Sequence, residues 1–184
     1  MGTHTSSPDE PDRHPTPAAL LGVYLNDHLT GASGGVDLAR RLAREHQRHP
    51  YGEPLAELAE AVAEDRAELV RIMRRLDVPV RRYKVAVGRL AEQVGRLKPN
   101  RALVRRSPLS SLLELEGMRL GTQGKAELWS TLLVLADDLG LDRRRLETLR
   151  DRAHEQADAL DQLRLREARE VFGTRPAHAA DHAS

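Results

Sequence analysis

Four residues of this sequence have side chains that could hold a single metal ion. His28, Asp65, Glu116 and Glu127 fall in or beside the apolar stripes of predicted helices when successive residues are placed about 100° apart. Imidazole and carboxylate groups together suit Zn, Fe or Mn. The helix directions decide which acid is level with His28: Glu127 if the first and fourth helices run in the same direction, Glu116 if all four alternate.

The same residues also fit a buried polar cluster that contains no metal. Interior polar side chains are almost always hydrogen-bonded, and a histidine and one or two acids can satisfy one another. Three further residues are expected to support such a cluster from the same apolar faces or their edges. They are Tyr24, Asp27 and Gln156.

Other chemical motifs are weak or missing. Asp151 and His154 have the spacing of a metal-binding acid–histidine pair, but their angular positions predict that both face water, and the same holds for Glu68. The chain has no cysteine and no glycine-rich nucleotide motif. Its serines have no histidine at a recognisable spacing. These observations favour a non-enzymatic role.

Apolar periodicity predicts four long helices. Proline, capping residues and glycine mark their ends, as at Ser107-Pro108, Gly140 and Asp142. The predicted helices run roughly from Pro17 to His46, Glu53 to Leu76, Pro108 to Asp138, and Asp142 to Phe172.

The third of these helices is apolar on two sides. We expect its core face to carry Leu109, Leu113, Leu120, Thr131 and Leu135, with Glu116 and Glu127 among them. The opposite face, with Leu115, Met118, Trp129 and Leu133, would then need a cover. Either the preceding connection or a second subunit could supply it, so a homodimer through the Trp129 face is one prediction.

The connection before this helix is strongly basic. It also contains an amphipathic stretch from Tyr83 to Leu97. Arginine-rich faces are most often solvated surface, but they can bind nucleic acid or an anionic membrane surface. The basic residues that would contact such a partner are Arg81, Arg82, Lys84, Arg89, Arg96, Lys98, Arg101, Arg105 and Arg106.

The helix order predicts an all-α, four-helix bundle with one long crossover that carries an extra amphipathic helix. Residues 17–172 thereby resemble the ferritin-like superfamily in helix order and loop lengths. That resemblance implies a di-metal site with a Glu from each of two helices and Glu-x-x-His from each of the other two. This chain lacks the complete set.

The composition of the chain indicates which segments are disordered and where in the cell the protein is expected. Residues 1–16 and 173–184 are expected to be disordered tails, and no apolar run is long enough to span a membrane. No secretory signal is evident, so a cytoplasmic location is expected. The leading hypothesis is a ferritin-like structural or interaction module. The alternatives are a metal-binding member of that superfamily with a reduced site, and a binder of anionic partners.

Overall fold

The computed structural model describes residues 14–81 and 108–173, and all regular structure in these two ranges is helical. The all-α prediction is therefore confirmed for these residues. No helix in them is long and apolar enough to cross a bilayer. The four helices are α1 (Pro17–Glu45), α2 (Gly52–Arg75), α4 (Pro108–Val134) and α5 (Arg143–Phe172).

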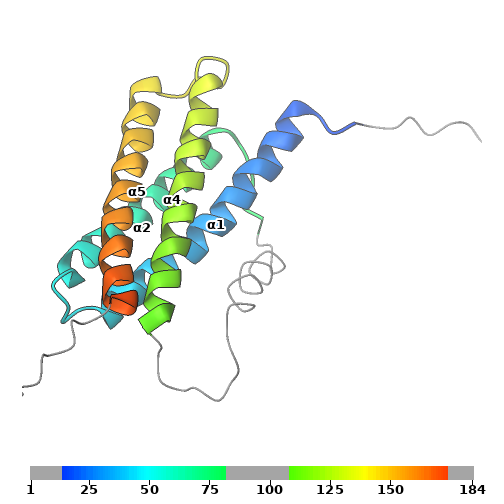
Figure 1. Cartoon of the computed structure of the whole chain (residues 1–184). Helices are drawn as coiled ribbons and strands as arrows, with labels where there is room; N and C mark the ends of the chain where they lie inside the picture. Colours follow the sequence, from blue (N-terminus) through cyan, green and yellow to red (C-terminus); the bar gives the residue numbers. More distant parts are fainter. Residues whose placement is uncertain (1–13, 82–107, 174–184) are drawn as a thin grey trace, which may run out of the picture.

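The helices form two hairpins that pack against each other (Figure 1). α1 packs on α2, α4 packs on α5, and α1 also contacts α4. In Figure 1, α1 and α5 run downward, whereas α2 and α4 run upward. The chain between α2 and α4 therefore joins opposite ends of the bundle. The extra amphipathic helix predicted within that connection lies outside the described residues.

Local capping chemistry fixes the helix ends. The side chain of Thr16 accepts a hydrogen bond from the Ala19 backbone N–H, and Pro17 occupies the first turn of α1. Asp142 caps α5 by accepting from the Arg145 backbone N–H at 3.1 Å. Gly140 has a φ of 61° in the turn before it, a conformation that glycine adopts without strain.

The turn between α1 and α2 requires glycine at position 52. A Cβ added there would collide with the backbone carbonyl oxygen of His46. We expect Gly52→Ala to lower the free energy of unfolding by about 1–3 kcal/mol, because the turn must open to relieve the overlap. Urea unfolding monitored by circular dichroism measures this change.

Gly121 provides the matched control for that substitution. It is also helical and surrounded by open space, since nothing lies within 4 Å of an added Cβ. Gly121→Ala should therefore stabilise the protein by about 0.5–1 kcal/mol through helix propensity. Equal effects of the two substitutions would contradict the assigned turn geometry.

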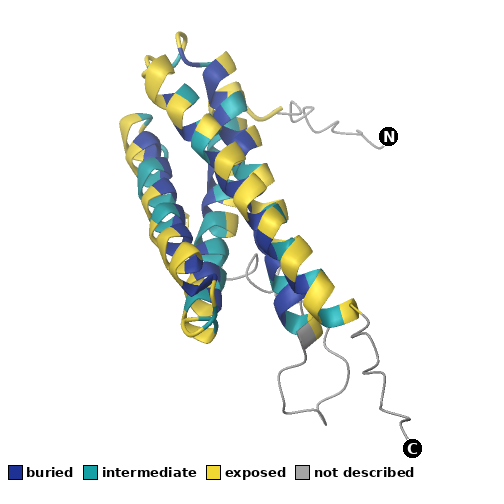
Figure 2. Ribbon diagram, turned by 60° about the vertical axis from the view of Figure 1, so that its left-hand side comes forward, coloured by how far each residue is buried: buried dark blue, intermediate teal, exposed yellow. Residues whose placement is uncertain are grey.

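The buried faces of the helices turn toward one another and form two hydrophobic clusters (Figure 2). One cluster lies toward the α4–α5 turn and includes Leu69, Trp129 and Leu149. The other lies toward the α1–α2 turn and includes Leu55, Leu115 and Leu160. Along α2, Asp65 falls between the two clusters, and along α4 Lys125 does the same. The core is therefore divided by a polar layer.

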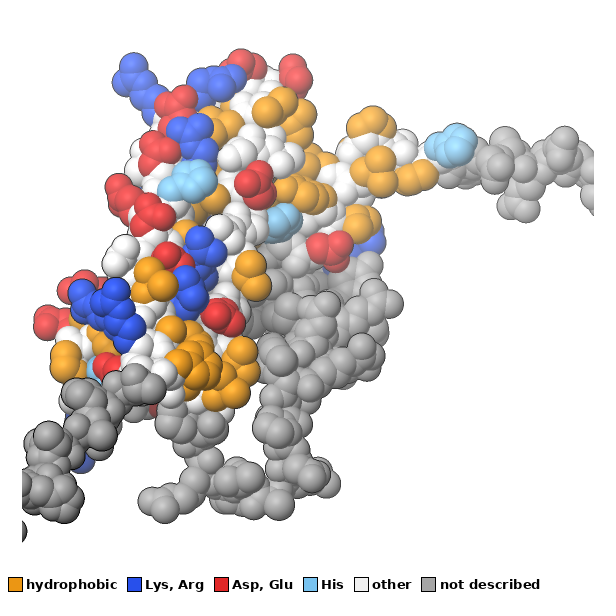
Figure 3. Space-filling view, viewed as in Figure 1, with side chains coloured by type: hydrophobic (Ala, Val, Ile, Leu, Met, Phe, Trp, Pro, Cys, Tyr) orange, Lys and Arg blue, Asp and Glu red, His pale blue; other side chains and the backbone are white. Residues whose placement is uncertain are grey.

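The core face of α4 is opposite to the predicted one. Leu115, Met118 and Trp129 are at most 3% exposed, whereas Leu120 is 66% exposed. Burying the predicted face would have placed two carboxylates in the core, which is costly without partners. Leu109 and Leu120 instead belong to the exposed hydrophobic side chains, some of which are visible on the surface in Figure 3.

Candidate functional site: a buried charged layer

Asp65 is the most deeply buried acid among the described residues, with 1% of its side chain exposed. It projects from the middle of α2 toward α4 and α5. Both of its carboxylate oxygens are bonded. Lys125 of α4 donates from Nζ to Oδ2 at 2.5 Å, and the guanidinium of Arg152 on α5 donates to Oδ1. The carboxylate is therefore held between two cations.

Gln156 completes the layer. It lies one helical turn after Arg152 on α5, and its side-chain Nε2 donates to Asp65 Oδ2 at 3.3 Å. Its Oε1 accepts a hydrogen bond from Lys125 Nζ. Gln156 is 8% exposed and is therefore a buried polar residue of the core. Its partners are Asp65 and Lys125.

Burial sets the electrostatics of Lys125. Its side chain is 13% exposed, and this desolvation lowers the pKa of the Lys125 ammonium, although the neighbouring Asp65 opposes the shift. Arg152 adds a further repulsion that lowers the same pKa. Because Nζ bonds to both Asp65 and Gln156, Lys125 is committed to the layer and is not a free nucleophilic amine.

The layer links the two hairpins of the bundle. Asp65 belongs to the α1–α2 hairpin, and its partners all belong to the α4–α5 hairpin. A buried carboxylate with several specific partners disfavours alternative helix registers, because sliding one helix would leave charges unpaired in the core. The arrangement can therefore fix the alignment of the hairpins.

His28 is not part of the hydrogen bonds that form this layer. It is half-buried on α1, where its ring lies edge-on to Tyr24 with ring centroids 4.5 Å apart. The hydroxyl of Tyr24 donates to Thr131 Oγ1 at 3.1 Å and so joins α1 to α4. Asp27 is exposed, so its predicted role in a buried cluster is wrong.

The burial of His28 gives stability a pH dependence. Desolvation lowers the pKa of its imidazole below 6.5, although nearby Asp27 raises it. As the pH falls below 6.5, the unfolded chain takes up a proton that the folded chain resists, so the free energy of unfolding should fall. Urea unfolding at neutral pH and at about pH 5 should show a smaller loss in His28→Gln than in wild type. Identical losses would contradict this role.

The four predicted metal ligands are not brought together. Glu127 is exposed, and Glu116 is half-buried with its Oε1 3.9 Å from Arg164 of α5. Asp65 is occupied by its two cations. Among all described residues, no three His, Asp or Glu side chains form a group that could hold a metal ion. The donor set therefore does not fit the predicted single-metal site.

Asp151, His154 and Glu68 were all predicted to face water, and the prediction is correct for the first two only. Asp151 and His154 are both exposed, as expected. Glu68, however, has a side chain that is only 13% exposed, because Arg71 and Arg145 bind its carboxylate. Burial alone would raise the pKa of Glu68, but the hydrogen bonds from the two arginines outweigh it and lower that pKa.

Two surfaces were predicted to bind partners: the Trp129 face and the basic residues between positions 81 and 106. Trp129 is 1% exposed within a core cluster formed by this chain, so a homodimer through the Trp129 face is not supported. Of the nine basic residues predicted to bind an anionic partner, only Arg81 is described. The other eight lie outside the described residues, and their binding role stays a prediction.

Asn26 and Tyr51 are buried residues with polar groups that the sequence pattern did not single out. Asn26 is 1% exposed and fastens the segment after α2 to α1: its Nδ2 donates to the Pro79 carbonyl at 3.1 Å, and its Oδ1 accepts from the Arg81 N–H at 2.7 Å. The hydroxyl of Tyr51 donates to Glu167 Oε2 at 2.5 Å, near the far end of the bundle. Burial and the Glu167 carboxylate both raise the pKa of Tyr51.

Comparisons of this chain with protein-family models, with curated proteins and with solved structures find no match. The functional interpretation therefore depends on the geometry described above.

Proposed function

We propose that this chain is a ferritin-like helical bundle that acts as a non-enzymatic structural or interaction module. Its support is the helix order, with one long connection between α2 and α4 and the parallel directions of α1 and α5. The observation that carries the proposal is the pairing of Asp65 with Lys125 and Arg152 in the polar layer of the core.

Ferritin-like metalloproteins place their carboxylates inward between facing helices, where the metal ions neutralise them. In this chain the inward carboxylate of Asp65 is paired with cationic side chains. Lys125 and Arg152 already bond both carboxylate oxygens of Asp65, so a divalent cation could bind this acid only by displacing them. In a metalloprotein the metal ion joins the helices. In this chain the ion pairs of Asp65 with Lys125 and Arg152 join them.

A metal titration tests the proposal. Ferrous iron, under anaerobic conditions, is titrated into the full-length protein by calorimetry, and bound iron is measured after desalting. We expect less than one equivalent per chain, with weak binding that Asp65→Asn and His28→Ala leave unchanged. One tightly bound equivalent that either substitution abolishes would overturn the proposal in favour of the metal-binding alternative.

A further inference from the structure

A cavity of about 160 Å³ lies between the last turns of α2 and the first turn of α5. It is outside the polar layer and is partly open to solvent. Three arginines line it: Arg71 and Arg75 from α2, and Arg145 from α5. Two carboxylates, those of Glu68 and Asp142, also line it. The lining therefore carries one more positive charge than negative charges.

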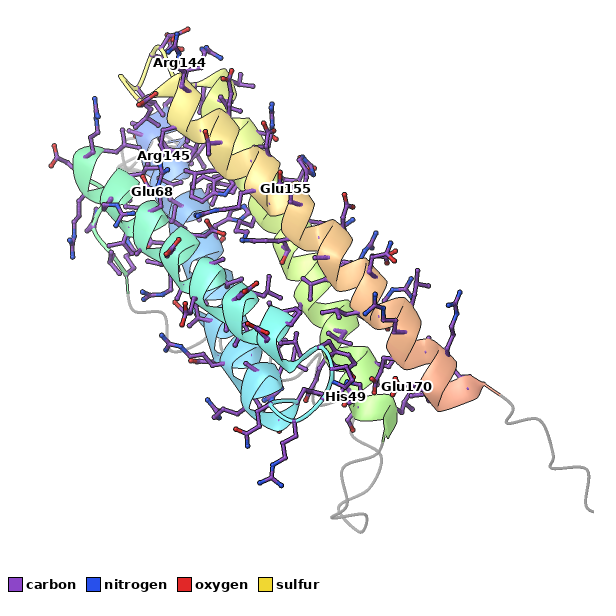
Figure 4. The ribbon with its side chains drawn as sticks, turned by 90° about the vertical axis from the view of Figure 1, so that its left-hand side faces the viewer. His49, Glu68, Arg144, Arg145, Glu155 and Glu170 are labelled. Atoms are coloured by element: carbon purple, nitrogen blue, oxygen red, sulfur yellow. The ribbon has the colours of Figure 1, made fainter. Side chains whose placement is uncertain are left out.

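The hydrogen bonds show how that charge is distributed. Arg71 and Arg145 share the single carboxylate of Glu68, whose position between α2 and α5 is visible in Figure 4. Arg75 donates from Nη2 to the backbone carbonyl of Gly140 at 2.5 Å, and that acceptor has no net charge. Arg71 and Arg145 therefore share one negative charge, whereas Arg75 is bonded to a neutral acceptor.

Asp142 is already counted in this balance, and its negative charge lowers the surplus to one. Its carboxylate accepts from the backbone N–H of Arg145 and so caps α5. The floor of the cavity is apolar, with Ile72 8% and Leu146 1% exposed, and Leu141 half-buried beside them. An apolar floor excludes water on one side and strengthens charge interactions at the rim.

We propose that this cavity, referred to below as the arginine pocket, binds a small phosphate-bearing anion through Arg71, Arg75 and Arg145. Guanidinium groups match phosphate oxygens in geometry and charge, and several can bind one phosphate at once. The volume is below the range of pockets that hold drug-sized ligands, which favours a phosphate or diphosphate group over a larger molecule. The proposal is independent of the ferritin-like assignment.

Calorimetry with inorganic phosphate and pyrophosphate tests the pocket directly. Full-length protein should bind pyrophosphate more tightly than phosphate, and acetate should bind weakly or not at all. Arg75→Gln and Arg71→Gln should each weaken pyrophosphate binding about tenfold, the effect of losing one charge-assisted contact. Thermal unfolding of each variant shows that the fold is retained.

Arg144 supplies the matched control, because it adjoins Arg145 in sequence, is exposed and does not line the cavity (Figure 4). Arg144→Gln should leave pyrophosphate binding unchanged. An equal loss in Arg144→Gln would overturn the pocket in favour of diffuse surface attraction. Absence of binding to wild type at low salt would also overturn it, as would acetate binding as tight as that of pyrophosphate.

The phosphate group could belong to a free anion or to a lipid headgroup. Flotation with phosphatidylcholine vesicles, with and without phosphatidic acid, distinguishes these sources. Flotation that requires phosphatidic acid and is lost in Arg75→Gln supports binding of a headgroup in the pocket. Pyrophosphate binding without flotation supports a free phosphate compound as the ligand.

Discussion

Asp65→Asn should lower the free energy of unfolding by about 3–5 kcal/mol, the largest effect expected for a single polar substitution in this chain. The asparagine amide keeps the size of the side chain but removes its charge. Lys125 and Arg152 would then face each other without the acid that both now bind. Urea unfolding of the two proteins at neutral pH measures the difference.

Glu64 is the matched control for Asp65. It precedes Asp65 on α2 and accepts from the same guanidinium, with Arg152 Nη1 3.2 Å from its Oε2, but its side chain is 68% exposed. Glu64→Gln should therefore change stability by less than about 1 kcal/mol, as exposed ion pairs do. A loss as small as this in Asp65→Asn would contradict the burial of charge that we describe.

Replacing the charged pair by apolar side chains should restore much of the stability lost in Asp65→Asn. Buried ion pairs can often be exchanged for hydrophobic residues of similar volume at little cost, because their desolvation offsets their attraction. We expect Asp65→Leu combined with Lys125→Met to be more stable than Asp65→Asn. The double variant should also show weaker selection of one helix register, seen as broader amide resonances by NMR.

Asn26→Ala should lower the free energy of unfolding by about 2 kcal/mol. The substitution leaves the Pro79 carbonyl and the Arg81 N–H without the side chain that now bonds both, and unsatisfied groups of this kind are costly. It also leaves a void beside Leu25 and Leu29, which are buried on the same helix. Urea unfolding measures the loss.

Hydrogen exchange gives a second readout for Asn26. In wild type the Arg81 amide donates to the Asn26 side chain, so its exchange should be slowed. That protection should disappear in Asn26→Ala and persist in Asp27→Asn, because Asp27 is exposed on the same turn. Unchanged protection of Arg81 in Asn26→Ala would show that Asn26 does not fasten this segment.

The helix boundaries could be predicted because local chemistry sets them. Pro17, Asp142 and Gly140 act through backbone geometry and capping within a few residues, so no knowledge of the tertiary structure is needed. The predicted ends fall within one residue of the observed ones for α1 and α2. α4 ends four residues earlier than predicted, at Val134, because its last residues form the turn that Gly140 closes.

The orientation of α4 could not be read from apolar periodicity alone. Both of its faces carry leucine, so periodicity gives two solutions that differ by half a turn. The polar residues decide between them: the buried face contains Lys125 and Thr122, which find partners, whereas the other contains Glu116 and Glu127. The signal available in the sequence was the position of Lys125, four residues before Trp129 and therefore on the same face.

The identity of Asp65 as an inward acid was predictable, but its partners were not. Its position between Val62 and Leu69 places it in the buried stripe of α2. The partners come from α4 and α5, and which of their polar residues arrive at this level depends on the packing of the two hairpins. The sequence pattern predicted a histidine partner for Asp65, whereas its observed partners are a lysine and an arginine.

Alignment of the two hairpins depends on the buried pairing of Asp65 with Lys125. A double-mutant cycle on Asp65→Asn and Lys125→Met, measured by urea unfolding, tests it most directly. We predict a coupling energy of about 2 kcal/mol or more between the two positions. Additive effects within about 0.5 kcal/mol would contradict the claim, since residues that do not interact behave in that way.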